Sequence, residues 1–85
     1  MPAPQEHSVI CTNVARLLRE EREKQEISLN SLAERAGISR QTVSFIENEE
    51  RNPTLMTLLR MTEVLGVPLE DLIKKARVEP TSRKR

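Results

Sequence analysis

Hydrophobic residues in this chain recur at intervals of three and four, the spacing of α-helices that bury one face. The pattern predicts five helices and no strands, over residues 11–24, 29–36, 40–48, 54–65 and 68–75. A connection of about three residues joins the second helix to the third, and so short a connection forces a sharp crossing. We therefore expect an all-α protein built around a central pair of short helices.

Serine and glycine mark the ends of these predicted helices. Ser28 and Ser39 each precede a helical pattern, where a hydroxyl can accept from the unpaired amides of the first turn. Gly37 supplies the positive φ that ends the first central helix, and Gly66 has the same position after the fourth helix. The stretch from Ser28 to Pro53 is therefore typical of a helix-turn-helix.

The apolar stripes of the two central helices leave one polar face outside. The stripes consist of Leu32, Ala33 and Ala36 on the first helix and of Val43 and Ile46 on the second. The opposite face of the second helix carries Arg40, Gln41, Ser44 and Phe45. Arginine suits guanine, glutamine suits adenine, and an apolar group suits the thymine methyl. From the shape alone, an ordinary solvated face is an equal alternative, because all-α proteins use the same turn for packing.

Composition limits the fold and the partners. The chain has 85 residues, enough for one small domain, and its only aromatic residue is Phe45, so aliphatic side chains must form the core. The net charge of +1 is too balanced to indicate nucleic acid by itself. Residues 1–50 hold 6 Lys and Arg against 9 Asp and Glu, and residues 51–85 hold 8 against 4. The acidic first half weakens non-specific DNA affinity but leaves room for a locally basic face.

Several function classes find no support in the sequence. Cys11 is the only cysteine, which excludes an internal disulfide and a multi-cysteine zinc site. With no signal-peptide pattern and no membrane-length apolar run, we expect a cytoplasmic protein without membrane contact. The chain lacks a paired nucleophile and base, a metal-ligand cluster and a phosphate loop. We expect no enzyme activity, no metal and no cofactor.

The sequence LAERAGISRQTVSFIE, followed by RNP and by LGV at residues 65–67, resembles the Cro/C1-type helix-turn-helix family of phage and bacterial repressors. The similarity runs from about residue 14 to residue 72. It implies a compact five-helix, lambda-repressor-like DNA-binding domain over residues 9–75, with the second and third helices as reading head. The proline-containing residues 1–8 are expected to form a flexible arm. Residues 76–85, ending in Arg83, Lys84 and Arg85, are expected to form a flexible basic tail that adds phosphate contacts or only solubility.

The resemblance also implies roles for individual residues. Phe45 faces the major groove and packs against thymine methyl groups, while Arg40 and Gln41 hydrogen-bond to bases. The further expected DNA contacts are Ser28, Asn30, Ser39, Thr42, Ser44, Arg51 and Asn52. The alternative for Phe45 is that its ring covers the preceding helix or meets a protein partner.

Two more features follow from the family pattern. Arg22 lies on the apolar stripe four residues after Leu18, and at the matching positions relatives have an ion pair between the first and third helices. We expect Arg22 to pair with Glu47; two exposed charges are the alternative. Relatives also commonly begin the second helix with a glutamine that contacts a phosphate. Here that residue is Leu29, so Asn30 or the Ser28 hydroxyl would take the phosphate instead.

Glycine commonly follows the first and third helices in relatives, where this chain has Glu26 and Glu49. If those positions require positive φ, each glutamate costs ~1 kcal/mol. The alternative after the third helix is that Asn48 takes the left-handed conformation.

The sequence favours a sequence-specific DNA-binding transcriptional regulator. Because one head reads only a few base pairs, the family usually binds inverted repeats in double-stranded DNA as a homodimer. The candidate dimer interface consists of Val67, Leu69 and Ile73. The alternative is an antitoxin or protein-interaction module of the same fold that neutralises a partner protein, with Phe45 and Arg40 buried against that partner.

Overall fold

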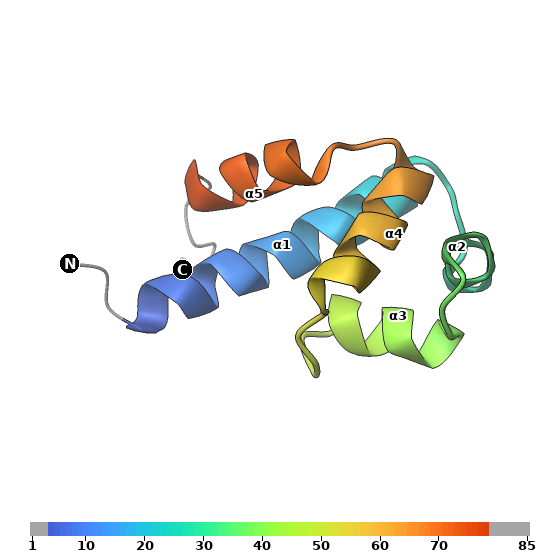
Figure 1. The fold of residues 1–85 in the computed structure, drawn as a ribbon, viewed down its shortest axis with the longest axis horizontal. Coiled ribbons are helices and arrows are strands. Elements are labelled where there is room, and N and C mark those ends of the chain that lie inside the picture. Colours follow the sequence, from blue (N-terminus) through green and yellow to red (C-terminus); the bar gives the residue numbers. More distant parts are fainter. Residues whose placement is uncertain (1–3, 79–85) are drawn as a thin grey trace.

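The computed structural model describes residues 4–78, with side chains from residue 7 onward, and this part contains five α-helices (Figure 1). They are α1 Pro4–Lys24, α2 Leu29–Ala36, α3 Arg40–Glu47, α4 Leu55–Leu65 and α5 Leu69–Val78. The described residues include no strand. The predicted all-α class and the number of helices are therefore confirmed.

The helices are arranged around the long α1. In Figure 1, α5 lies alongside α1 on one side of the molecule and α3 lies on the opposite side, while α4 crosses α1 between them. α2 packs against both α3 and α4. Their apolar faces meet in one aliphatic core made of Val14, Leu17, Leu18, Leu32, Ala33, Val43, Ile46, Met61, Leu65, Leu72 and Ala76. The stripes predicted for α2 and α3 are all part of the buried interior.

The first helix begins at Pro4, so the predicted start at Cys11 is wrong. Proline is tolerated in the first turn of a helix, where its missing N–H would have no partner, so Pro4 opens the helix instead of preventing it. Residues 4–8, expected to be a flexible arm, are helical in this structure.

The last helix ends at Val78 and not at about Lys75, so that predicted end is also wrong. Ala76 is buried, and its carbonyl accepts a hydrogen bond of 2.9 Å from Nδ2 of the buried Asn13 on α1. This contact holds the last turn of α5 against α1. Arg83, Lys84 and Arg85 of the expected basic tail lie outside the described residues.

Helical spacing along the fourth helix predicts a buried stripe of Leu55, Leu58, Leu59, Thr62 and Leu65, and this prediction is partly wrong. The side chains of Met61, Thr62 and Leu65 are buried, but Leu55 is 65% exposed and Leu59 is 47% exposed. The helix is so rich in leucine that its sequence offers two overlapping stripes. The stripe of Leu58, Met61, Thr62 and Leu65 packs on the core, whereas Leu55 and Leu59, four residues apart on the neighbouring stripe, remain outside.

Candidate nucleic-acid interface

Serine and threonine side chains cap the N-termini of α2, α3 and α4. The backbone N–H groups of Ser31, Thr42 and Thr57 donate to the hydroxyls of Ser28, Ser39 and Thr54 over 3.0, 3.0 and 3.1 Å, respectively. The two predicted caps, Ser28 and Ser39, are therefore confirmed. A capping hydroxyl that accepts from an amide keeps its own proton for another acceptor, and Thr54 donates this proton to Thr57 Oγ1 over 3.0 Å. Each cap also lies at the positive end of a helix dipole, a suitable place for a phosphate.

The same backbone motif ends the first four helices. After α2 and α4 the left-handed residues are Gly37 at φ 74° and Gly66 at φ 73°. After α1 and α3 they are Glu26 at φ 59° and Glu49 at φ 63°. In each case the next residue donates its N–H to the carbonyl five positions earlier, as Glu50 does to Phe45 over 2.8 Å. Asn48 has φ −92°, so the alternative placing it in the left-handed region is wrong.

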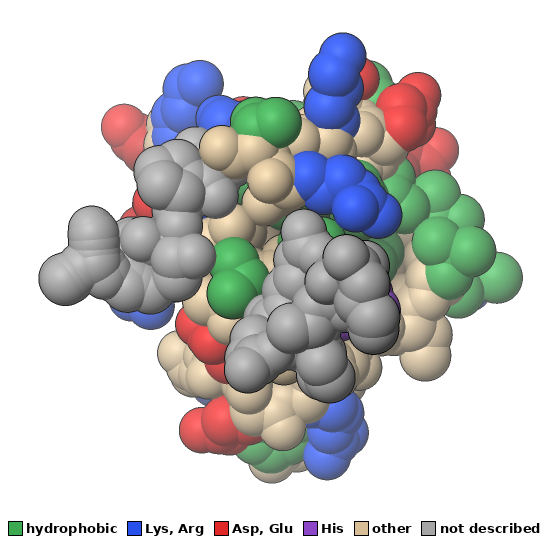
Figure 2. All heavy atoms as spheres, turned by 90° about the vertical axis from the view of Figure 1, so that its left-hand side faces the viewer, with side chains coloured by type: hydrophobic (Ala, Val, Ile, Leu, Met, Phe, Trp, Pro, Cys, Tyr) green, Lys and Arg blue, Asp and Glu red, His purple; other side chains and the backbone are tan. Residues whose placement is uncertain are grey.

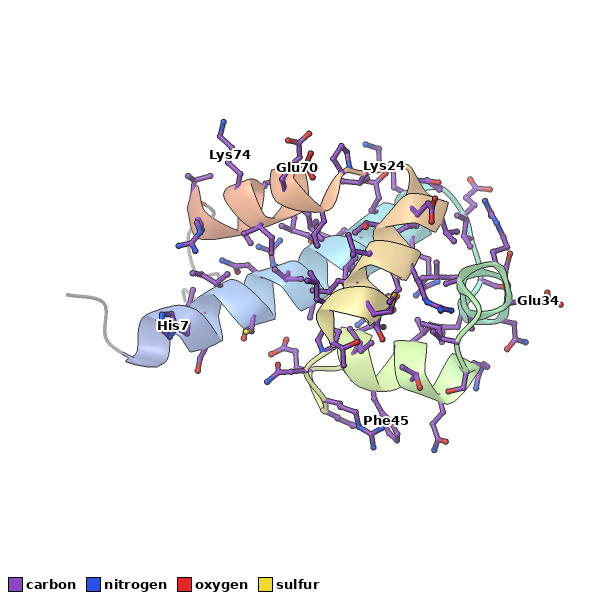
Figure 3. All side chains as sticks on the ribbon, in the orientation of Figure 1. His7, Lys24, Glu34, Phe45, Glu70 and Lys74 are labelled. Atoms are coloured by element: carbon purple, nitrogen blue, oxygen red, sulfur yellow. The ribbon has the colours of Figure 1, made fainter. Side chains whose placement is uncertain are left out.

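The outer face of α3 carries the predicted reading residues. Val43 and Ile46 are buried on the inner face, whereas Arg40 and Gln41 are exposed in the first turn. Phe45 is half-buried and projects away from the other helices (Figure 3). The alternative in which this ring covers α2 therefore does not describe this structure.

The loop after α3 contributes a further arginine to this face. The guanidinium carbon of Arg51 lies 4.8 Å from the centroid of the Phe45 ring, within cation–π range. Asn52, the next residue in the sequence, is also exposed. Arg51 is one of the predicted DNA contacts, but nothing in the residue spacing indicates its stacking on Phe45, because the intervening turn decides where the loop runs.

The start of α2 supplies the remaining predicted contacts. Asn30 is exposed in the first turn, next to the Ser28 cap. Leu29 is half-buried and packs against the core, so the first position of α2 is used for packing. Ser39 and Thr42 share a hydrogen bond of 2.7 Å between their hydroxyls, which leaves one hydroxyl proton of the pair available. Ser44, half-buried, accepts from Asn48 Nδ2 over 3.3 Å.

An ion pair holds α3 to the end of α1, as the sequence predicted. Arg22 donates from Nε to Glu47 Oε2 over 2.8 Å and from Nη2 to Glu47 Oε1 over 3.0 Å. The side chains are 12% and 4% exposed. Arg22 also donates to the Ile27 carbonyl over 2.7 Å. The hydrogen bond to Glu47 raises the pKa of Arg22 above its ordinary value. The pair thereby fixes the orientation of α3 from its inner side.

Two further contacts support the loops that border this surface, and the sequence did not reveal them. Thr12 Oγ1 on α1 donates to Glu49 Oε1 over 3.1 Å. Gln25 Nε2 donates to the Leu65 carbonyl over 2.7 Å and so joins the ends of α1 and α4. Both contacts link residues far apart in the chain, which helical periodicity cannot reveal.

The predicted dimer-interface residues are not the most exposed apolar side chains. Val67, Leu69 and Ile73 are all half-buried and pack against the core. The large apolar side chains that face solvent on α4 are Leu55, Met56 and Leu59, which are 65%, 61% and 47% exposed. We call these three residues the α4 patch. Figure 2 shows hydrophobic side chains gathered at its right-hand edge, the side on which α4 crosses in front of α1 in Figure 1.

The sequence that contains α2 and α3 matches a known protein family. The family model described as Helix-turn-helix matches residues 18–72, which is more than half of the chain. The chain belongs to the Cro/C1-type helix-turn-helix family. Members of this family are DNA-binding transcriptional regulators and not enzymes.

Curated relatives carry names that agree with this family. The chain is 43% identical over 54 residues to an HTH-type transcriptional regulatory protein of Methanococcus maripaludis, a match that covers 64% of this chain and 17% of that protein. It is 37% identical over 65 residues to the HTH-type transcriptional regulator y4dJ of Sinorhizobium fredii, which covers 76% of this chain and 79% of the relative. The matched region thus spans a small part of the archaeal protein and most of the rhizobial one.

A solved structure of a relative includes DNA. SinR, described as the master regulator for biofilm formation and crystallised in complex with DNA, matches this helix-turn-helix chain with a TM-score of 0.66 and 30% identity. The match covers 71% of this chain and 97% of the SinR chain.

The described helices are also too short or too polar to span a bilayer.

Proposed function

We propose that this Cro/C1-type chain is a sequence-specific transcriptional regulator that binds an inverted repeat in double-stranded DNA as a homodimer. The proposal rests on the outer face of α3, where Arg40 and Gln41 are exposed and Phe45 projects outward. These side chains can recognise guanine, adenine and the thymine methyl in the major groove.

The helix starts around α3 would set the register on the phosphate backbone. Ser28 and Asn30 begin α2, Ser39 and Thr42 begin α3, and Asn52 lies in the loop that leads to α4. Capping hydroxyls, helix dipoles and exposed amides are the groups that bind phosphate without reading sequence. Ser44 and Arg51 complete the proposed contact surface.

A homodimer is proposed because one α3 covers only a few base pairs, and two heads one helical turn apart recognise a longer site. We propose the α4 patch as the interface. Its first residue, Leu55, begins α4 directly after the loop that contains Asn52, so the patch starts near the proposed DNA-facing side. A two-fold axis there would bring the same apolar residues of two copies together. The face with Val67, Leu69 and Ile73, predicted from sequence, offers less free apolar surface.

The decisive experiment is selection of bound sites from a random DNA pool at two salt concentrations, for the parent protein, Phe45→Ala and Arg40→Ala. We expect an inverted repeat, with base preferences lost at separate positions in the two variants. If no sequence is enriched and the affinity is weak and wholly salt-controlled, the regulator proposal fails. The search should then turn to a protein partner, as expected of an antitoxin or an interaction module.

A further inference from the structure

The contact between Arg51 and Phe45 joins two side chains that can read different bases. Arg51 lies in the loop after α3, and its guanidinium carbon is 4.8 Å from the centroid of the Phe45 ring. A guanidinium stacked on a ring directs its N–H groups sideways in its own plane, so the stack leaves these donors available. The ring is half-buried and projects outward, so part of it remains for an apolar contact.

No acidic side chain within the described residues forms an ion pair with Arg51. Glu49 and Glu50 precede it in sequence, but Glu49 Oε1 accepts a hydrogen bond from Thr12 on α1. Arg51 is itself exposed. Its charge is therefore held in place by the aromatic ring and is free to meet an acceptor on a ligand.

The guanidinium carbon and the ring centroid are 4.8 Å apart, which is more than one base-pair step. Successive base pairs in B-DNA are about 3.4 Å apart along the helix axis. Two planar groups held one above the other, with their edges facing the groove, would therefore face neighbouring base pairs and not the same one. A phenyl ring recognises the thymine methyl, and a guanidinium recognises guanine O6 and N7.

We propose that Phe45 and Arg51 act as one stacked reader of two adjacent base pairs, with Phe45 on a thymine methyl and Arg51 on the neighbouring guanine. This inference rests on the proposed DNA-binding function and deepens it, because it names a thymine–guanine neighbour pair within each half-site. It also makes Phe45 a positioning residue for Arg51, in addition to its own base contact.

The test compares Phe45→Leu, Phe45→Ala and Arg51→Lys with the parent in the random-pool selection. Leucine keeps an apolar contact but loses the ring face, so we expect Phe45→Leu to retain thymine preference and to weaken guanine preference at the neighbouring position. Phe45→Ala should weaken both preferences. Arg51→Lys keeps the charge but loses the planar fork, so guanine preference should fall about tenfold or more while thymine preference remains.

Two modified sites isolate each half of the reader in direct binding measurements. Replacing the thymine by deoxyuridine removes only the methyl group, and this should weaken the parent several-fold and leave Phe45→Ala unchanged. Replacing the neighbouring guanine by 7-deazaguanine removes one acceptor, and this should weaken the parent more than Arg51→Lys. Arg77→Ala is the matched control for charge, because α5 lies on the opposite side of the molecule from α3 (Figure 1).

The outcomes separate this inference from the proposed function. If an inverted repeat is enriched but Arg51→Lys keeps guanine preference, or Phe45→Leu leaves it intact, the stacked reader is overturned and the regulator remains. A uniform loss of affinity in Arg51→Ala, with the salt slope reduced by about one, would make Arg51 a phosphate contact and also overturn it. If no sequence is enriched, the proposed function itself fails.

Discussion

At the scale of single residues, the clearest unfavourable free-energy term in this fold comes from two glutamates in the left-handed conformation. Glu26 and Glu49 have φ of 59° and 63° at helix ends, where Gly37 and Gly66 do the same task without a Cβ penalty. The helix-ending hydrogen bonds form in all four cases, so the motif is kept despite the side chain. The strain is therefore local and can be relieved without changing the fold.

We predict that Glu26→Gly raises the free energy of unfolding by about 1 kcal/mol, because glycine adopts positive φ without steric cost. For a domain of this size the melting temperature should rise by roughly 4–8 °C, measured by circular dichroism. Glu26→Ala is the matched control, since alanine removes the charge but keeps the Cβ. An equal gain in the alanine variant would show that charge, not backbone strain, is the cause.

Glu49→Gly should also raise the melting temperature, but by less than Glu26→Gly. The reason is that Glu49 accepts a hydrogen bond from Thr12, and the glycine variant loses it. Combining Thr12→Val with each glycine variant separates the two effects, because Thr12 donates its hydrogen bond to Glu49 and not to Glu26. An unchanged or lower melting temperature for Glu49→Gly in the Thr12→Val background would count against strain at this position.

At the scale of elements, the ion pair between Arg22 and Glu47 sets how α3 sits on α1. Its two hydrogen bonds are short and its side chains are largely shielded from water, so each charge depends on the other. Because Arg22 also donates to the Ile27 carbonyl, it supports the turn into α2 as well. One side chain thus connects the orientation of α3 with the entry to α2.

We predict that Glu47→Gln lowers the free energy of unfolding by about 3 kcal/mol, because it leaves the buried guanidinium without a compensating charge. The double variant Arg22→Met, Glu47→Met should lose less than the sum of the single variants, since no charge is stranded. Urea denaturation of the parent, Arg22→Met, Glu47→Met and the double variant measures this coupling. Additive losses would mean that the two charges stabilise the fold independently.

A second element-scale contact lies between α1 and α5. Asn13 is 1% exposed and donates to the Ala76 carbonyl over 2.9 Å. We predict that Asn13→Leu destabilises the fold by roughly 1–3 kcal/mol, because it leaves a buried carbonyl without a donor. Hydrogen exchange should show the loss first in the last turn of α5. Protection lost evenly over all helices would instead indicate a general packing defect.

The sequence predicted elements best where both ends carried local signals. The bounds of α2 were predicted correctly because Ser28 and Gly37 sit next to it, and those of α3 were wrong by one residue at Asn48. The start of α1 was wrong because Pro4 is compatible with both an arm and a first helical turn. The exposed side of α4 depends on which leucine stripe meets the core, which only the packing of other helices decides.

The candidate site was predictable to a similar extent. The sequence identified the outer face of α3, since helical spacing separates Arg40 and Gln41 from the buried Val43. It also identified the Arg22–Glu47 pair, through the family pattern and not through spacing alone. The stack of Arg51 on Phe45 was missed because it depends on the path of a loop, for which the sequence has no periodic signal.

At the scale of the whole molecule, charge and exposed apolar surface suggest how the chain would assemble on DNA. The net charge is only +1, so long-range attraction to phosphate is weak, and affinity for DNA would come from specific contacts and from the second copy in the proposed homodimer. Linking two weak heads through a dimer makes the second binding event intramolecular, which can strengthen binding by about 10²–10⁴. Loss of the dimer should therefore affect a full inverted repeat far more than a single half-site.

We predict that Leu59→Glu makes the protein monomeric, because it places a charge in the middle of the α4 patch, where two copies would meet. Leu59 is 47% exposed, so the monomer fold should survive, and thermal melting checks this. Sedimentation velocity measures the assembly, and binding to full and half sites should show a loss of at least about tenfold on the full site alone. Val78→Glu is the matched control, since Val78 is 75% exposed on α5. A charge disrupts a dimer only where it becomes buried between two copies. If Leu59→Glu remains dimeric and a folded Ile73→Glu variant is monomeric, the interface therefore lies at Val67, Leu69 and Ile73.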